Sequence, residues 1–115
     1  MKNILTLLLA CAALGAQAAP QCSADKFVIV SKTGRMDDQF LYVVGKVRND
    51  NPVACGVQLK MEVYDKAKNL IDTRESWPAS ISNIAAGSTY SFKMHMERAR
   101  DSKGYSIEVA RARAW

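Results

Sequence analysis

The sequence predicts an all-β fold, a sandwich of two packed antiparallel sheets with six or seven short strands in an immunoglobulin-like arrangement. Apolar and polar residues alternate along several segments, which is the period of a strand buried on one face. Turn-forming segments separate these stretches at short intervals. After residue 18, no stretch of useful length has the period of a helix, so a β–α–β fold is disfavoured.

The first 18 residues have the pattern of a secretory signal peptide. Lys2 supplies a positive start, residues 4–14 are predominantly apolar, and Ala16-Gln17-Ala18 provides the small-x-small cleavage signature. The apolar run is shorter than the roughly 20 residues that a membrane-spanning helix needs, and no second run follows. We therefore expect a periplasmic or secreted protein without a transmembrane segment. A lipoprotein anchored at Cys11 is the alternative.

Cleavage after Ala18 would leave about 97 residues, which is the size of a single domain over residues 19–115. The formal net charge of +5 would fall to about +4, and acidic residues are interspersed among the basic ones. Nucleic-acid-binding proteins more often gather Lys and Arg in one stripe, so we expect no nucleic-acid partner. A monomer or a weak oligomer is expected.

Cys22 and Cys55 form an even pair once the leader and its Cys11 are removed. In an oxidising compartment such a pair predicts a disulfide. Closing a loop of about 33 residues would remove roughly 3 to 4 kcal/mol of unfolded-state entropy. Two free thiols or a metal site are the alternatives, but no nearby His or further Cys completes a metal site.

The first two strands are expected at residues 26–30 and 40–49. The first is rich in β-branched and aromatic side chains, and the Ser-Lys-Thr-Gly sequence at residues 31–34 predicts a turn after it. In the second, odd-numbered positions are mostly apolar, whereas even-numbered positions carry aromatic and basic side chains. It ends at a polar Asn-Asp-Asn-Pro sequence.

The clearest alternation lies at residues 55–65 and predicts a strand with one face in the core. A five-residue polar turn, residues 65–69, would join it to a strand starting at Leu70. Trp77 and Pro78 mark an edge or a bend, because proline cannot donate to a strand ladder.

Two further strands complete the pattern. Residues 90–96 place Tyr90, Phe92 and two methionines on one face, with Lys93 and His95 on the other. Residues 97–104 are polar and predict a loop, and residues 105–114 predict the last strand.

Several of these stretches resemble the FxLYD-type domains of exported bacterial proteins. The matching features are a Gly-x-Val-x-Asn strand end, a hydrophobic strand that finishes in Tyr-Asp, and a small-residue turn before a Phe strand. They lie at residues 40–49, 57–65, 84–87 and at Phe92, so the resemblance spans roughly residues 40–96, over half of the expected mature chain.

This sequence departs from the FxLYD pattern at two turns. Ala86 stands where such domains often carry proline, and residues 66–69 replace a glycine-bearing turn. The resemblance implies an immunoglobulin-like binding or structural module, and it offers no catalytic residues to carry over.

The residues themselves also predict a non-enzymatic protein without a cofactor. His95 is the only histidine, and no nucleophile elbow is present. Asp37 and Asp38 are adjacent but lie in a polar loop, where acids more often form a turn than an acid–base pair. Gly45 is expected to let the strand bend or to permit close packing, and Asn49 and Asp65 to close turns by bonding to the backbone.

Outward-facing aromatic residues are the better indication of binding. If the odd positions of residues 40–49 face the core, Phe40 and Tyr42 face outward together with Lys46 and Arg48, and Tyr64 has a similar position on its own strand. Such a surface would suit another protein of the cell envelope, bound through a sheet face or an edge strand. The alternative is that a loop, the chain end or a second buried face covers these side chains.

The alternative hypothesis is a copper site at Met94, His95 and Met96, because thioether and imidazole ligands suit Cu(I). In a strand His95 points away from the two methionines, which favours core packing. A periplasmic copper-binding or carrier protein would require Met36 or Met61 to converge on them from another strand.

Overall fold

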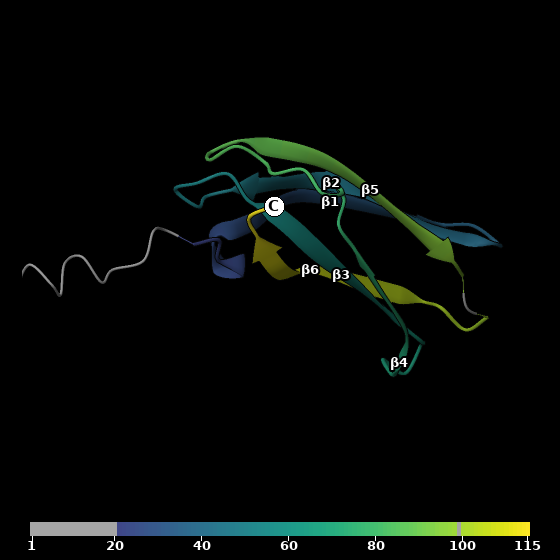
Figure 1. Ribbon diagram of the computed structural model, residues 1–115. Coiled ribbons are helices and arrows are strands. Elements are labelled where there is room, and N and C mark those ends of the chain that lie inside the picture. The colour runs from purple at the N-terminus through teal and green to yellow at the C-terminus, as the bar shows by residue number, and fades with distance from the viewer. Residues whose placement is uncertain (1–20, 99) are drawn as a thin grey trace, which may run out of the picture.

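The computed structural model describes residues 21–98 and 100–115, so the expected leader at residues 1–18, with Cys11 and the cleavage site, lies outside the described residues. Its strands form two three-stranded antiparallel sheets, with the orders β1-β2-β5 and β4-β3-β6 (Figure 1). The predicted all-β sandwich is confirmed, with six strands. A short 3₁₀ turn, Ala24–Lys26, precedes β1 Phe27–Met36, β2 Phe40–Asn49, β3 Gly56–Tyr64, β4 Leu70–Ser76, β5 Thr89–Glu97 and β6 Gly104–Arg113.

The core lies between the sheets and is built from alternate residues of the central strands. On β2 the inward side chains are Leu41, Val43 and Val47, and each is at most 1% exposed. Leu59 and Met61 on β3 are fully buried opposite them. The period of two in the sequence therefore identified the buried faces of these strands correctly.

The turn predicted at residues 31–34 is wrong, because β1 continues through it to Met36. These residues pair with β2 after a bulge between Ile29 and Ser31. The lack of a side chain at Gly34 lets the ring of Tyr105 on β6 pack against the backbone of β1, because a Cβ at this position would collide with that ring. Backbone pairing along β2 and the glycine contact with the other sheet outweigh the local preference for a turn.

Two aspartates close turns, Asp37 between β1 and β2 and Asp65 between β3 and β4. Asp37 Oδ1 accepts hydrogen bonds from the backbone amides of Phe40 at 2.7 Å and Gln39 at 2.8 Å. Asp65 Oδ1 accepts one from the amide of Asn69 at 2.9 Å, as the sequence predicted for this residue. The bonds from Phe40 first, and then from Gln39, lower the pKa of Asp37. The bond from the amide of Asn69 lowers the pKa of Asp65.

Replacing these two aspartates by asparagine should weaken the acid sensitivity of the fold. Because their folded-state pKa values lie below the usual 3.8, their contribution to stability is present above that pH and is lost as the pH falls through the lowered values. Thermal unfolding between pH 2 and pH 6 should show a smaller fall in Tm for D37N/D65N than for the wild type. D38N is the matched control, since Asp38 accepts neither bond. Parallel curves for wild type and double variant would contradict the assignment.

Gly45 lies opposite Phe92 in the pairing of β2 with β5. A Cβ at this glycine would lie 2.7 Å from the end of the Phe92 ring, far inside van der Waals contact. The Phe92 side chain therefore packs directly on the backbone of β2, and the predicted role of Gly45 in close packing is confirmed.

A buried polar cluster ties the N-terminal segment to the end of β2. The predicted disulfide between Cys22 and Cys55 is present, with the two Cα atoms 5.7 Å apart. Asn49 is fully buried, and its Nδ2 donates to the carbonyl of Ile84 at 2.8 Å and to that of Val53 at 3.0 Å. Its Oδ1 accepts from the amide and the side-chain nitrogen of Asn51, both at 2.9 Å. The predicted turn-closing role of Asn49 is confirmed and involves four hydrogen bonds.

Candidate functional site: an aromatic and basic sheet face

The outer face of the sheet β1-β2-β5 carries the side chains that the sequence marked for binding. Phe40, Tyr42, Lys46 and Arg48 alternate along β2 with residues that point into the core, so they point outward. Lys46 is exposed, whereas the other three are half-buried. Their outward direction follows from the alternation, and their partial burial comes from their neighbours on the same face.

Tyr42 lies at the centre of a row that crosses all three strands of this sheet. It pairs with Arg35 on β1 and with His95 on β5. The guanidinium carbon of Arg35 lies 5.1 Å from the centre of the Tyr42 ring, within the range of a cation–π contact. On the other side the His95 ring stacks on Tyr42, with ring centres 6.4 Å apart.

Phe40 completes the aromatic part of this face. Its ring centre lies 5.8 Å from that of Tyr42 and 6.3 Å from that of His95, so three rings from two strands contact one another. The next row towards Lys46 consists of Thr33, Val44 and Lys93. We call the following residues the aromatic–basic face: Arg35, Phe40, Tyr42, Val44, Lys46, Lys93 and His95.

The surface of this face is hollowed at two places. A shallow cavity of about 390 Å³ is lined by Thr33, Arg35, Tyr42, Val44 and Lys93. Val44 is 47% exposed there, which is high for a valine in a central strand. A second cavity of about 450 Å³ lies where Phe40 and His95 meet residues 72–74 of β4. Half-buried rings beside hollows and exposed apolar atoms are the kind of surface that a partner's side chains can fill.

The electrostatics of the face are basic, but Arg48 contributes little to it. Arg48 Nε lies 2.6 Å from Asp50 Oδ1, and a second contact of 3.0 Å makes the pair bidentate. The hydrogen bond to Asp50 raises the pKa of Arg48, and the same bond lowers the pKa of Asp50. Arg48 is therefore neutralised within the chain.

The other basic side chains of the face keep their charge available. Arg35, Lys46 and Lys93 are exposed. Within residues 21–98 and 100–115, the ion pairs are Arg48 with Asp50 and Lys60 with Glu62, so none of these three cations is paired. The face thus presents three unpaired positive charges around a cluster of rings.

Tyr64 does not belong to this surface. It is half-buried and faces outward, as the sequence predicted, but β3 lies in the second sheet. Its hydroxyl contacts that of Ser106 on β6 at 3.4 Å. Alternation along a strand shows which side chains point outward, but it does not show which sheet the strand joins.

The structure places His95 on the opposite face of β5 from Met94 and Met96. Met94 and Met96 are 3% and 6% exposed and belong to the core, whereas His95 lies on the outer face against Tyr42. Met61 is buried in the same core, and Met36 is partly buried and packs against it. In the part of the chain that the structure describes, no group of three or more His, Cys, Asp or Glu side chains is placed to hold a metal ion.

Sequence analysis missed the three members of the face that lie on β1 and β5, Arg35, Lys93 and His95. The alternation at residues 90–96 placed Lys93 and His95 on a polar face, which was the available signal. The alternation could not show that this face lies beside Phe40 and Tyr42, because in the sequence β2 and β5 are separated by two strands of the other sheet. Arg35 was missed because the chain was expected to turn just before it.

Comparison of the chain with protein-family models, with curated proteins and with solved structures found no match. Among residues 21–98 and 100–115, no helix is long and apolar enough to cross a membrane.

Proposed function

We propose that this protein is an exported, non-enzymatic binding module of the bacterial cell envelope, of the FxLYD type, which captures a protein partner through its aromatic–basic face. The observation that carries the proposal is the row Arg35–Tyr42–His95, in which a cation and two rings stack across three strands. Rigid aromatic and Arg side chains contribute disproportionately to binding energy at protein interfaces, and a sheet holds them in place at little entropic cost.

The charge of the face indicates the chemistry of the partner. Three unpaired cations surround the rings, so an acidic protein surface would gain both a faster encounter and a favourable contact. The Cys22–Cys55 disulfide supports an oxidising location, which agrees with a partner in the envelope.

Replacing Phe40 and Tyr42 by serine should weaken partner capture at least about tenfold while the domain stays folded. Both rings are half-buried on the outer face, so the free energy of unfolding should fall by no more than about 2 kcal/mol. The measurement is quantitative affinity capture from the envelope fraction with wild type and variant, followed by titration of the isolated partner. Unfolding of the variant would show that the rings serve the core.

L70S/I71S is the matched control for this experiment. Leu70 and Ile71 are 52% and 37% exposed on β4 and line neither hollow of the face, so the change removes two exposed apolar side chains outside it. K46E/K93E tests the charge separately, and it should slow association most at low salt. Equal capture by wild type, F40S/Y42S and K46E/K93E would exclude this face as the binding surface.

A further inference from the structure

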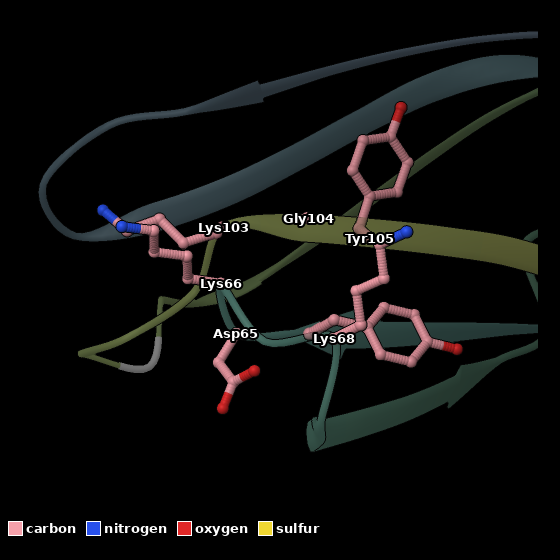
Figure 2. A pocket seen from close by; sticks show the side chains of 7 residues that line it. Asp65, Lys66, Lys68, Lys103, Gly104 and Tyr105 are labelled. Carbon is pink, nitrogen blue, oxygen red and sulfur yellow. The ribbon is translucent and has the colours of Figure 1, made fainter.

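The sheet β4-β3-β6 carries different groups at its two ends. At the end beside the β3–β4 turn lies a cavity of about 720 Å³, but Tyr64 lines it from the outer face of the sheet and Tyr105 from the inner one. In Figure 2 the Lys68 side chain also extends away from those of Lys66 and Lys103. These groups do not surround one ligand, whereas the aromatic groups at the other end of the sheet contact one another.

At that other end, three side chains form a row across the outer face. The indole of Trp115 lies over the bare backbone of Gly56, since a Cβ at this glycine would collide with the indole nitrogen. Arg113 pairs with Gly56, and its guanidinium carbon lies 4.1 Å from the centre of the Trp115 ring. Trp77, just after β4, meets the same ring in a T-shaped contact with ring centres 5.2 Å apart. Because Asn83 Oδ1 also accepts from the amide of Trp115 at 3.0 Å, the row has a defined geometry.

Gln58 lies beside this row and has a buried acceptor that lacks a donor. By the alternation of β3 it points to the outer face, where it pairs with Arg111 on β6. Ser76 pairs with the inward-facing Leu59, so the next residue, Trp77, lies beside Gln58 on the β4 side. Gln58 is only 8% exposed, and its Oε1 accepts no hydrogen bond from the described part of the chain. A ligand that brings a hydroxyl or N–H group to this oxygen would therefore gain a favourable contact.

The surface around Gln58 is accessible and positively charged. We call the following residues the Trp–Arg patch: Gln58, Trp77, Arg111, Arg113 and Trp115. Trp115 is 43% exposed, and Trp77 is half-buried. Both arginines are exposed, and neither has an ion-pair partner in residues 21–98 and 100–115. A guanidinium that stacks on a ring keeps its in-plane N–H groups for a carboxylate.

A sugar ring that carries a carboxylate matches all three kinds of group in the patch. Its C–H groups pack on aromatic rings, whose faces are negative. Its hydroxyl groups are donors for the unpaired oxygen of Gln58, and its carboxylate accepts paired hydrogen bonds from arginine. A phosphate group offers only acceptors, so it would leave the Gln58 oxygen without a donor.

We propose that the Trp–Arg patch binds an acidic glycan, an oligosaccharide whose sugar rings carry carboxylates. The two indoles contact the C–H groups of the sugar, a hydroxyl donates to Gln58 Oε1, and Arg111 and Arg113 bind the carboxylate. The patch lies on the opposite sheet from the aromatic–basic face, so this binding is independent of the protein partner proposed above.

The test compares two tetrasaccharides of different charge. The hyaluronan fragment alternates glucuronate with N-acetylglucosamine, whereas the chitin fragment contains N-acetylglucosamine alone and is neutral. Trp77 and Trp115 are the two tryptophans of the chain, so tryptophan emission reports on the patch. Titration of the folded, disulfide-bonded protein should give a saturable change with the hyaluronan fragment and at least about fivefold weaker binding of the chitin fragment. Equal affinities, or no saturable change up to about 10 mM hyaluronan fragment, would overturn the proposal.

Substitutions of the rings and the arginines locate the site, with calorimetry as the measurement. W77A/W115A should weaken binding of the hyaluronan fragment at least about tenfold, whereas F40S/Y42S, which removes two rings from the other sheet, should leave it unchanged. R111Q/R113Q should abolish the preference for the acidic fragment. R35Q/R100Q is the matched control, since it removes the same charge from exposed arginines elsewhere. Equal losses in the two arginine variants would show that only net charge matters, and the site would be rejected.

Gln58→Met separates recognition from a structural role. The change keeps the length of the side chain and removes the unpaired acceptor, so the Tm should stay the same or rise. Binding of the hyaluronan fragment should weaken at least about fivefold, because the hydroxyl of the sugar loses its acceptor. A lower Tm with unchanged affinity would show that Gln58 serves the fold and would contradict the assignment.

Competition and NMR distinguish a glycan from an acidic protein segment. Tetraglutamate should not displace the hyaluronan fragment, and displacement at equal concentration would make the patch a general site for carboxylates and overturn the proposal. Amide shifts induced by the hyaluronan fragment should centre on residues 56–58 and 111–115. Shifts centred on residues 40–48 would place the glycan on the aromatic–basic face and contradict the proposed site.

Discussion

Replacing Cys22 and Cys55 together by alanine should lower the free energy of unfolding by about 3 to 4 kcal/mol. The disulfide closes a loop with a sequence separation of 33, and the loss of this constraint frees the unfolded chain by that amount on the chain-entropy model. For a domain of this size the Tm should fall by about 15 °C or more. Since whole domains are stable by only about 5 to 15 kcal/mol, this is the largest single effect that we expect.

Denaturant unfolding of wild type and C22A/C55A measures this loss directly. Reduction of the wild-type protein with a thiol should reproduce it, because reduction removes the same cross-link without changing the sequence. C22A/C55A should be insensitive to the reductant. A difference below about 1 kcal/mol between oxidised wild type and the double variant would show that the loop is already constrained by the surrounding hydrogen bonds.

Asn49→Ala should destabilise the fold by about 3 kcal/mol. Asn49 is fully buried, and its side chain takes part in hydrogen bonds with Val53, Ile84 and Asn51. Truncation leaves the buried amide of Asn51 without its acceptor and the half-buried carbonyl of Val53 without its amide donor. A buried polar group that loses its partner costs about 1 to 3 kcal/mol.

Asn83→Ala is the matched control for this prediction. Asn83 also bonds to backbone groups, the amide and the carbonyl of Trp115, but it is exposed, so water replaces the lost bonds. Its loss should cost less than about 1 kcal/mol. Chemical denaturation of both variants gives the comparison, and similar losses for the two would show that burial of Asn49 does not set its importance.

Much of the fold was predictable because local alternation determines which residues are buried. The bounds of β2 agree with the sequence, as do the five-residue turn after β3 and the core face of β5. The end of β1 was predicted wrongly because a Gly-containing stretch reads locally as a turn. Only the contact between Gly34 and Tyr105, residues far apart in the sequence, shows why a glycine lies inside a strand there.

The candidate sites were less predictable because they depend on strand order. Phe40 and Tyr42 were identified from their outward position, but Arg35 and His95 join them only because β2 lies between β1 and β5. Alternation carries no information about neighbours that approach from distant parts of the chain.

The contact between Gly45 and Phe92 also acts as a steric check on assembly of the first sheet. If β2 slipped by two residues against β5, every side chain would keep its face, and hydrophobicity alone would hardly distinguish the misaligned sheet from the native one. Such a slip would bring Val43 or Val47 opposite Phe92, where the aromatic ring already occupies the space above the backbone. A single missing methyl group thus rejects the misaligned pairings that the alternating pattern would otherwise tolerate.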